Sequence, residues 1–292
     1  MRRYGVFQKF LRGVSCGLFV LICFLPPSHA QESNKVPHRI ISLGPIITKT
    51  IYLLGAEQQL IANTTYCNMP FAAKQKEKIG TVKQMNIEKV VRLKADLILA
   101  NALSSQKQIK TLRKFGIRIH RFEDPKTFSE MCLMTLELGK VLGRKKQAEQ
   151  IIDKAQIEMD GIVSKTKDLP KKTVFFQIGI KPLHTAVKET FINEYIEFSA
   201  GTNIAMHERN GAYSREKVIQ KNPDVILIAT MGSSKSAGKT EKKNWMKFQS
   251  INAVKKNEIH ILDPDIICSP TPVTFIKGLK VIVKILHPEI TL

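Results

Sequence analysis

Two glutamates occupy matching places in two similar stretches of the chain. Glu88 precedes Asp96 by eight residues, and Glu216 precedes Asp224 by the same number. Each glutamate stands two residues after an Asn or Ser, the side chains that cap helices, and each is followed by a short helical pattern and a buried strand. An acid in the first turn of a helix stabilises the helix through its dipole. This role by itself would account for each glutamate when it is considered singly. Their matched positions also indicate a paired surface feature.

The residue types that most often catalyse or bind metals are dispersed. The chain has no G-x-S-x-G elbow and no cluster of acid and base residues, so we expect it not to be an enzyme. Neither a C-x-x-C pair nor metal-ligand spacing is present, so no metal site made by the protein alone is expected. The histidines after residue 30 are His38, His120, His184, His207, His260 and His287.

Residues 232–240 resemble a phosphate-binding loop, since they follow a strand and end in Gly-Lys-Thr. Five residues separate the two glycines where the nucleotide motif has four, and no apolar helix follows. We therefore expect a solvated basic loop here and no nucleotide site.

Residues 1–30 have the three parts of a secretory signal. A basic start is followed by an apolar core over 14–25 and by small residues at 28–30. The apolar run is shorter than the roughly 20 residues that span a bilayer. Ile22 before Cys23 does not fit lipoprotein cleavage. We expect a cleaved signal peptide and a soluble periplasmic chain of a Gram-negative cell.

The chain is basic, with a formal net charge of +21. Removal of the four Lys and Arg residues of 1–30 leaves +17, a charge that would attract a nucleic acid, a membrane surface or an acidic ligand. The basic residues are spread along the chain, and no aromatic-basic motif of a DNA- or RNA-binding module occurs. We therefore expect no nucleic-acid partner.

Short β-branched runs alternate with helical periods in two series, which predicts an α/β fold with two Rossmann-like lobes. The N-lobe is expected over residues 38–125 and the C-lobe over 170–290. Residues 126–168 have no strand signal and no proline, and their apolar residues recur at helical spacing. They predict a linker of one or two long helices, and such an architecture suits a ligand held between lobes.

Eight short motifs in order carry a family resemblance over about residues 38–290. Together they resemble the periplasmic substrate-binding proteins of ABC importers for vitamin B12, ferric siderophores and haem, and most of all the cobalamin-binding branch. The motifs are Arg-Ile-Ile-Ser-Leu-Gly-Pro at 39–45, Tyr-Cys-Asn-Met-Pro at 66–70, Met-Asn-Ile-Glu at 85–88, the strand after Asp96, residues 175–182, 201–204, 214–216 with 222–224, and Leu-His-Pro-Glu at 286–289.

The resemblance implies a class III-type substrate-binding protein with a long rigid interlobe helix and limited cleft closure. In the cobalamin branch a glutamate on each lobe pairs with arginines of the permease, and Glu88 and Glu216 stand at the matching positions. A carboxylate suits this role because it accepts two parallel hydrogen bonds from an arginine. The implied partners are a small metal chelate and an ABC permease with its ATPase. The implied protein is a monomer without a cofactor of its own.

The implied ligand is cobalamin or a related corrinoid. Tyr66 keeps an aromatic position of the branch, Asn101 stands where a tryptophan is expected, and Tyr213 is the aromatic residue of a C-lobe loop. His184 lies in a cleft loop, where it is either an axial ligand to the chelated metal, a hydrogen-bonding partner or an ordinary loop histidine. Asp265 matches a ligand-contacting acid and would equally serve as a cap for the next turn.

Other functions remain open. Haem or a ferric siderophore is the alternative ligand, and the +17 charge would help to attract an anionic one. A ligand-free sensor or interaction protein is a different class, indicated by the loss of cleft tryptophans. An exported α/β enzyme is a further class, which a panel of hydrolase assays would test.

Overall fold

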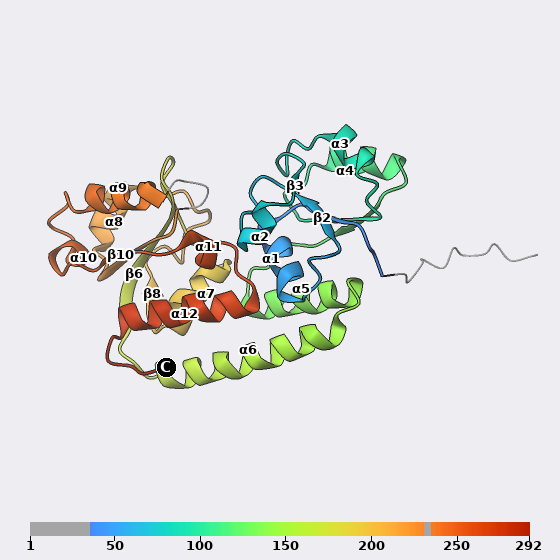
Figure 1. Ribbon diagram of the computed structural model, residues 1–292. Helices are drawn as coiled ribbons and strands as arrows, with labels where there is room; N and C mark the ends of the chain where they lie inside the picture. The colour runs from blue at the N-terminus through green and yellow to red at the C-terminus, as the bar shows by residue number, and fades with distance from the viewer. Residues whose placement is uncertain (1–35, 231–234) are drawn as a thin grey trace, which may run out of the picture. The chain divides into compact units, whose positions relative to one another are not determined.

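The structure is a computed structural model, and it describes residues 36–230 and 235–292 (Figure 1). The expected signal peptide over 1–30 lies outside the described residues. The strands are β1 (Ile40–Ser42), β2 (Leu60–Asn63), β3 (Glu77–Lys78), β4 (Leu97–Ala100), β5 (Arg118–Arg121), β6 (Lys172–Gly179), β7 (His184–Thr185), β8 (Gly201–Asn203), β9 (Val225–Ile228) and β10 (Ile259–Ile261). The helices are α1 (Pro45–Leu53), α2 (Phe71–Lys74), α3 (Ile87–Arg92), α4 (Gln106–Lys114), α5 (Phe128–Val141), α6 (Lys145–Thr166), α7 (Phe191–Phe198), α8 (Arg215–Lys221), α9 (Lys235–Trp245), α10 (Asn252–Lys255), α11 (Pro264–Ile267) and α12 (Pro272–Leu286).

The N-lobe is built on five parallel strands in the order β3-β2-β1-β4-β5. Strand β4 shows why both faces of this sheet are covered. Leu97 and Leu99 pack with α1 and α5 on one face, while Ile98 and Ala100 pack with α3 and α4 on the other. A strand that is apolar on both faces is typical of parallel sheets between helical layers. The expected α/β N-lobe is confirmed.

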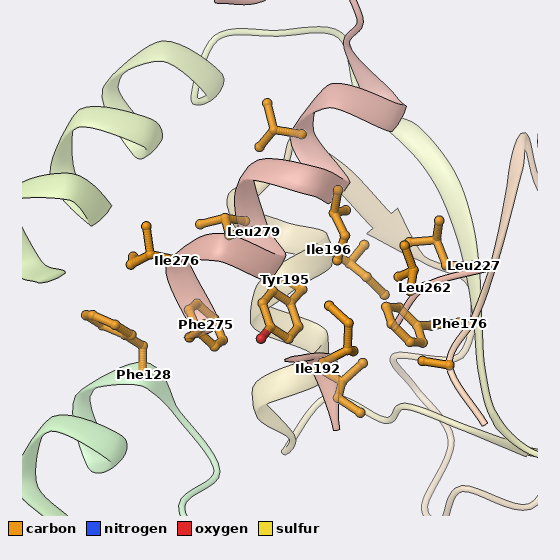
Figure 2. Close-up of a cluster of buried hydrophobic side chains, with 14 of the residues drawn as sticks. Phe128, Phe176, Ile192, Tyr195, Ile196, Leu227, Leu262, Phe275, Ile276 and Leu279 are labelled. Atoms are coloured by element: carbon orange, nitrogen blue, oxygen red, sulfur yellow. The ribbon is translucent and has the colours of Figure 1, made fainter. Parts of the chain in front are cut away.

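The C-lobe sheet has the order β10-β9-β6, and both β7 and β8 pair with the free side of β6. Only β7 runs antiparallel to its neighbour among these pairs. One face packs against α7 and α12, where the ring of Tyr195 stacks on Phe275 at 4.2 Å between centroids (Figure 2). The other face packs against α8, α9 and α10 through Val218, Trp245 and Val254. The expected second α/β lobe is also confirmed.

Helices α5 and α6 form a hairpin whose apolar side chains are shared between both cores. Phe128 at the start of α5 belongs to the C-lobe core, whereas Leu138 near its end belongs to the N-lobe core. Along α6 the order is reversed, from Ala148 in the N-lobe core to Met159 in the C-lobe core. A Cβ on Gly139 would lie 2.6 Å from the Cβ of Ala148, so the close approach of the helices requires glycine. The linker is therefore two helices, and rotation of one lobe against the other would have to unpack them.

A loop was expected over residues 232–240. Residues 232–234 lie outside the described residues, and the prediction is wrong for 235–240, which form the start of helix α9. Gly238, Glu241 and Trp245 recur at helical spacing on the buried side of α9. Burial of this face against the sheet stabilises a helix that its polar sequence does not predict. Within the described residues no helix is both long and apolar enough to cross a bilayer.

Candidate ligand cleft and docking surface

The carboxyl ends of β1, β2 and β4 bring two predicted ligand residues to one edge of the N-lobe sheet. Tyr66 lies in the loop after β2 and is 57% exposed. Asn101 directly follows β4 and is buried. Its Oδ1 accepts a hydrogen bond of 3.0 Å from the hydroxyl of Ser104, and its Nδ2 would lie 3.2 Å from a Cβ on Gly44. Parallel strands deliver their following loops to the same edge, which is where α/β proteins bind ligands.

Three apolar side chains at this edge escaped the sequence analysis. Met69, Phe71 and Leu103 lie in the segments that follow β2 and β4, and they are exposed, Phe71 by 70%. Together with Tyr66 they form what we call the apolar edge. Isolated exposed apolar residues are common, but several at one functional edge indicate a binding surface. Little in the sequence indicated them: Met69 and Phe71 lie close to Tyr66, Leu103 follows the β4 strand, and none of the three belongs to an amphipathic pattern.

The loop that carries Tyr66 is built around the ammonium group of Lys78. Its Nζ donates to Asn63 Oδ1 at 2.7 Å, to the Cys67 carbonyl at 2.9 Å and to the Ala73 carbonyl at 3.2 Å. Burial lowers the pKa of the Lys78 amine. The acceptors are all uncharged, so the cation organises the loop without being neutralised by it.

The C-lobe contributes His184 and Asp265 after the ends of β6 and β10. His184 begins β7, and a Cβ on Gly211 would lie 3.0 Å from its Nδ1, so its ring packs over that glycine. Asp265 is exposed in the first turn of α11. Its backbone N–H donates to Asp263 Oδ1 at 2.9 Å, so Asp263 caps this helix and the alternative capping role of Asp265 is wrong.

Tyr213 does not lie with these residues. It is 9% exposed, its ring packs on Phe175 at 5.6 Å between centroids, and Lys217 Nζ lies 5.5 Å from its ring centroid. Burial, with a smaller contribution from Glu208, raises the pKa of its hydroxyl. This core packing argues against the expected ligand contact of Tyr213.

Lys49 of α1 joins the two lobes directly. Its Nζ donates to the backbone carbonyl of Asp265 and, at 2.9 Å, to that of Ser269. Burial lowers the pKa of the Lys49 amine, while Asp265 and, more weakly, Cys268 oppose this shift. Helix α1 of the N-lobe therefore meets the α11 segment of the C-lobe through a half-buried cation. No sequence motif pointed to Lys49, because its partners are backbone carbonyls more than 200 residues away in the chain.

The two matched glutamates are exposed at the second residues of α3 and α8. Capping is done by their neighbours: Asn86 Oδ1 accepts from the Lys89 N–H at 2.9 Å, and Ser214 Oγ accepts from the Lys217 N–H at 3.2 Å. The backbone N–H of Glu216 and the Ser214 hydroxyl lower the pKa of the Glu216 carboxyl. Both helices lie on the side of their lobe that faces away from α6 (Figure 1).

Three further features concern possible metal sites, surface hollows and cysteines among the described residues. They contain no group of three or more His, Cys, Asp or Glu side chains arranged to hold a metal ion. Two surface hollows, of about 600 Å³ and about 370 Å³, lie along α5, α6 and α7 and share Glu194. Neither is lined by the apolar edge, His184 or Asp265. Cys67, Cys132 and Cys268 are buried free thiols.

A family model described as "periplasmic binding protein" matches residues 40–266. An uncharacterised ABC transporter substrate-binding lipoprotein of Bacillus subtilis, YvrC, is 30% identical over 264 residues, which cover 88% of this chain and 82% of the relative. The vitamin B12-binding protein of Photorhabdus laumondii is 28% identical over 74% of this chain and 78% of its own length.

The fold is shared with a periplasmic haem-binding protein from Pseudomonas aeruginosa. That structure aligns with a TM-score of 0.77 at 21% identity and covers 87% of this chain and 94% of its own. Members of the family are substrate-binding transport proteins, and the Photorhabdus relative is named for vitamin B12 binding. Since the family model spans most of both lobes, the chain belongs to the periplasmic binding protein family of ABC transporter substrate-binding proteins.

Proposed function

We propose that the chain captures cobalamin or a related corrinoid between its lobes and delivers it to an ABC permease. The observation that carries this proposal is the apolar edge, where Tyr66, Met69, Phe71 and Leu103 are exposed after the carboxyl ends of β2 and β4, the strands on either side of β1. A corrinoid presents broad apolar surface, and burial of exposed apolar side chains against it is favourable. The similarity to proteins named for vitamin B12 binding supports the same choice.

The C-lobe half of the proposed site is polar. His184 and Asp265 follow strands whose carboxyl ends lie in one sheet, and Lys49 reaches the Asp265 carbonyl from the other lobe. We assign His184 as the candidate axial ligand of the chelated metal, since a neutral imidazole binds both cobalt and iron. Asn101 and Asp265 are assigned as hydrogen-bonding contacts.

Haem or a ferric siderophore is the second candidate, and Lys49 favours it. The Lys49 amine is a cation held at the lobe junction by uncharged carbonyls, so a ligand carboxylate would be a stronger partner for it. The basic net charge of the chain would also raise the local concentration of such an anion.

Delivery would use the exposed acids Glu88 and Glu216 as contacts for permease arginines. The proposed mature protein is a periplasmic monomer that starts after residue 30, with lobes over 38–125 and 170–290. A photo-crosslinking residue at position 88 or 216 should capture an integral membrane protein in membranes of the producing cells. Glu88→Arg and Glu216→Arg should each abolish that capture from the other position.

Ligand binding is tested by titration of residues 31–292 with cyanocobalamin, dicyanocobinamide, haemin and a ferric hydroxamate. Calorimetry gives the affinity and the visible spectrum reports the metal. Phe71→Ala should weaken corrinoid binding by about tenfold or more, because a buried aromatic contact is lost. The matched control is Phe115→Ala, which removes another exposed phenyl ring, 59% exposed, just after the end of α4.

The outcomes separate the alternatives. A spectral shift that His184→Ala abolishes would establish the axial ligand. Binding of haemin or hydroxamate alone would replace the corrinoid assignment and keep the import role. Failure to bind any of the four ligands would favour a ligand-free sensor or interaction protein.

A further inference from the structure

Beside each docking glutamate stands a second helix that is rich in lysine. Helix α4 carries Lys107, Lys110, Arg113 and Lys114, all exposed, and contains no acidic residue. Residues 107, 110 and 114 recur at the spacing of one helical face, opposite the buried Ile109 and Leu112.

Helix α9 repeats this arrangement in the C-lobe. Lys239 and Lys243 are exposed on the side away from the buried Gly238, Glu241 and Trp245, and Lys242 is half-buried at the border of that side. The one acid of α9 is Glu241, which is buried and paired with Arg215, so it does not offset the lysines. Two amphipathic helices of unrelated sequence thus present the same charge to solvent.

These lysines and Arg113 are not neutralised within the lobes. Among the described residues, no carboxylate lies within 4.0 Å of their side-chain nitrogens. By contrast, Lys89 pairs with Glu77, Lys145 with Glu149 and Lys217 with Glu208. Leaving two whole helix faces unpaired concentrates positive potential at two places on the surface.

Each basic helix is attached to the helix that carries the matched glutamate, which we call the docking helix: α4 to α3, and α9 to α8. In the N-lobe, Gln108 of α4 accepts a hydrogen bond from the Met85 N–H at 3.1 Å and donates to the Met85 carbonyl at 2.9 Å, just before α3. In the C-lobe, Arg215 of α8 donates to Glu241 of α9 at 2.6 Å. Packed neighbouring helices are about 10 Å apart, so each basic face lies within about one helix diameter of its glutamate. Figure 1 shows α4 beside α3 and α9 beside α8.

We infer that the outer faces of α4 and α9 bind the anionic phospholipid headgroups of a membrane surface. The location of that membrane rests on the proposed function: a permease that receives Glu88 and Glu216 lies in a bilayer, whose headgroups then surround the two docking helices. Lysine attracts lipid phosphate as a flexible point charge and needs no shaped pocket. Two patches, one on each lobe, would orient the protein with its cleft towards the transporter and raise its concentration there.

The test is co-sedimentation of residues 31–292 with vesicles of phosphatidylethanolamine and phosphatidylglycerol, compared with vesicles of phosphatidylcholine alone. Binding is expected only to the anionic vesicles and should fall as salt is added. Each lysine near the surface contributes about fivefold to partitioning. The triple variants K107Q/K110Q/K114Q and K239Q/K242Q/K243Q should therefore each lower the partition constant by about a hundredfold.

The matched control is K140Q/K146Q/K154Q, which removes three exposed lysines from the α5–α6 hairpin and changes the net charge equally. Equal loss in the control would overturn the inference, because net charge alone would then explain binding. Binding of a DNA duplex with the same dependence on α4 and α9, without vesicle binding, would also overturn it. Thermal unfolding of each variant checks that the fold is retained.

The vesicle assay uses ligand-free protein, so its outcome is independent of the proposed function. Vesicle binding without chelate binding would support the phospholipid-binding faces and contradict the proposed ligand. Chelate binding without vesicle binding would support the proposed ligand and contradict the phospholipid-binding faces.

Discussion

The two lobes hold the helices that carry Glu88 and Glu216, α3 and α8, in different ways. In the N-lobe, α3 is joined to α4 by Gln108, whose amide makes two hydrogen bonds to the backbone of Met85. In the C-lobe, α8 is joined to α9 by an ion pair between Arg215 and Glu241, and the Glu241 side chain is only 4% exposed. One attachment is uncharged and the other depends on a buried carboxylate.

The C-lobe attachment extends into a network around the single tryptophan. Glu241 also accepts hydrogen bonds from Gln177 at 2.8 Å and Asn244 at 3.0 Å, and Gln177 accepts one from the Trp245 indole at 2.7 Å. The Arg215 guanidinium lies 4.4 Å from the Trp245 ring centroid. Trp245 therefore supports α8 from inside the lobe and is not available to a ligand. The two lobes therefore present a similar surface arrangement although different side-chain contacts hold the helices in place.

The largest expected effect is the loss of the buried carboxylate. Glu241→Ala would leave Arg215 without its ion-pair partner and would remove one acceptor each from Gln177 and Asn244. We expect a loss of about 3–5 kcal/mol in unfolding free energy. Urea unfolding measures it. Glu189→Ala serves as a control, because Glu189 is an exposed partner of Lys126 and should cost less than about 1 kcal/mol. Equal losses in the two variants would show that the buried carboxylate contributes no more to stability than an exposed one.

A pH series sharpens the comparison further. Burial raises the pKa of the Glu241 carboxyl, but the hydrogen bonds from Gln177, Asn244 and Arg215 outweigh burial and leave the pKa below its ordinary value of 4.5. A lowered pKa stabilises the fold above the unfolded value, and this stabilisation is lost as the pH falls through the folded value. The difference between wild type and Glu241→Gln, about 1.5–3 kcal/mol at neutral pH, should therefore shrink below about pH 4.5. A difference that does not change with pH would contradict the assignment.

The N-lobe attachment should be weaker and insensitive to pH. Gln108→Ala removes two hydrogen bonds to the backbone and should cost about 1–2 kcal/mol. Gln106→Ala, in the first turn of the same helix, controls for the change in helix propensity. A cost for Gln108→Ala as large as that of Glu241→Ala would show that the two attachments are energetically alike.

The smallest effects should come from the helix caps, which the two lobes share. Asn86→Ala and Ser214→Ala each remove one side-chain acceptor, and each should cost about 1 kcal/mol. Thermal unfolding of the two variants measures the costs side by side. We expect them to agree within about half a kcal/mol; a clear inequality would mean that the deeper network also supports the cap of α8.

Much of the fold was predictable because its signals are local. The strand expected after Asp96 is found at Leu97–Ala100. Alternation of apolar runs with helical periods reports the neighbours along the chain, and parallel sheets follow from it. Helix α9 was missed because its sequence is polar and its stability comes from one buried face, which includes a charged residue.

The candidate site was predictable only in part. Tyr66 and Asn101 reach the same edge because parallel strands align their carboxyl ends, which the strand order alone implies. Tyr213 was expected in the cleft and is found in the core, because sequence shows that a residue is aromatic but not which side of a sheet its ring covers. Phe71 and Leu103 had no periodic pattern to distinguish them from ordinary loop residues.

The sequence by itself determined the two-lobed α/β class, the family resemblance and the matched places of Glu88 and Glu216, because each depends on spacing along the chain. Only the tertiary structure decided which lysines are paired, that Trp245 is buried, and that Lys49 of one lobe reaches carbonyls of the other. The physical reason is that burial and hydrogen-bond partners depend on contacts between residues far apart in sequence. Such contacts form only when the sheets, the hairpin and α12 pack together.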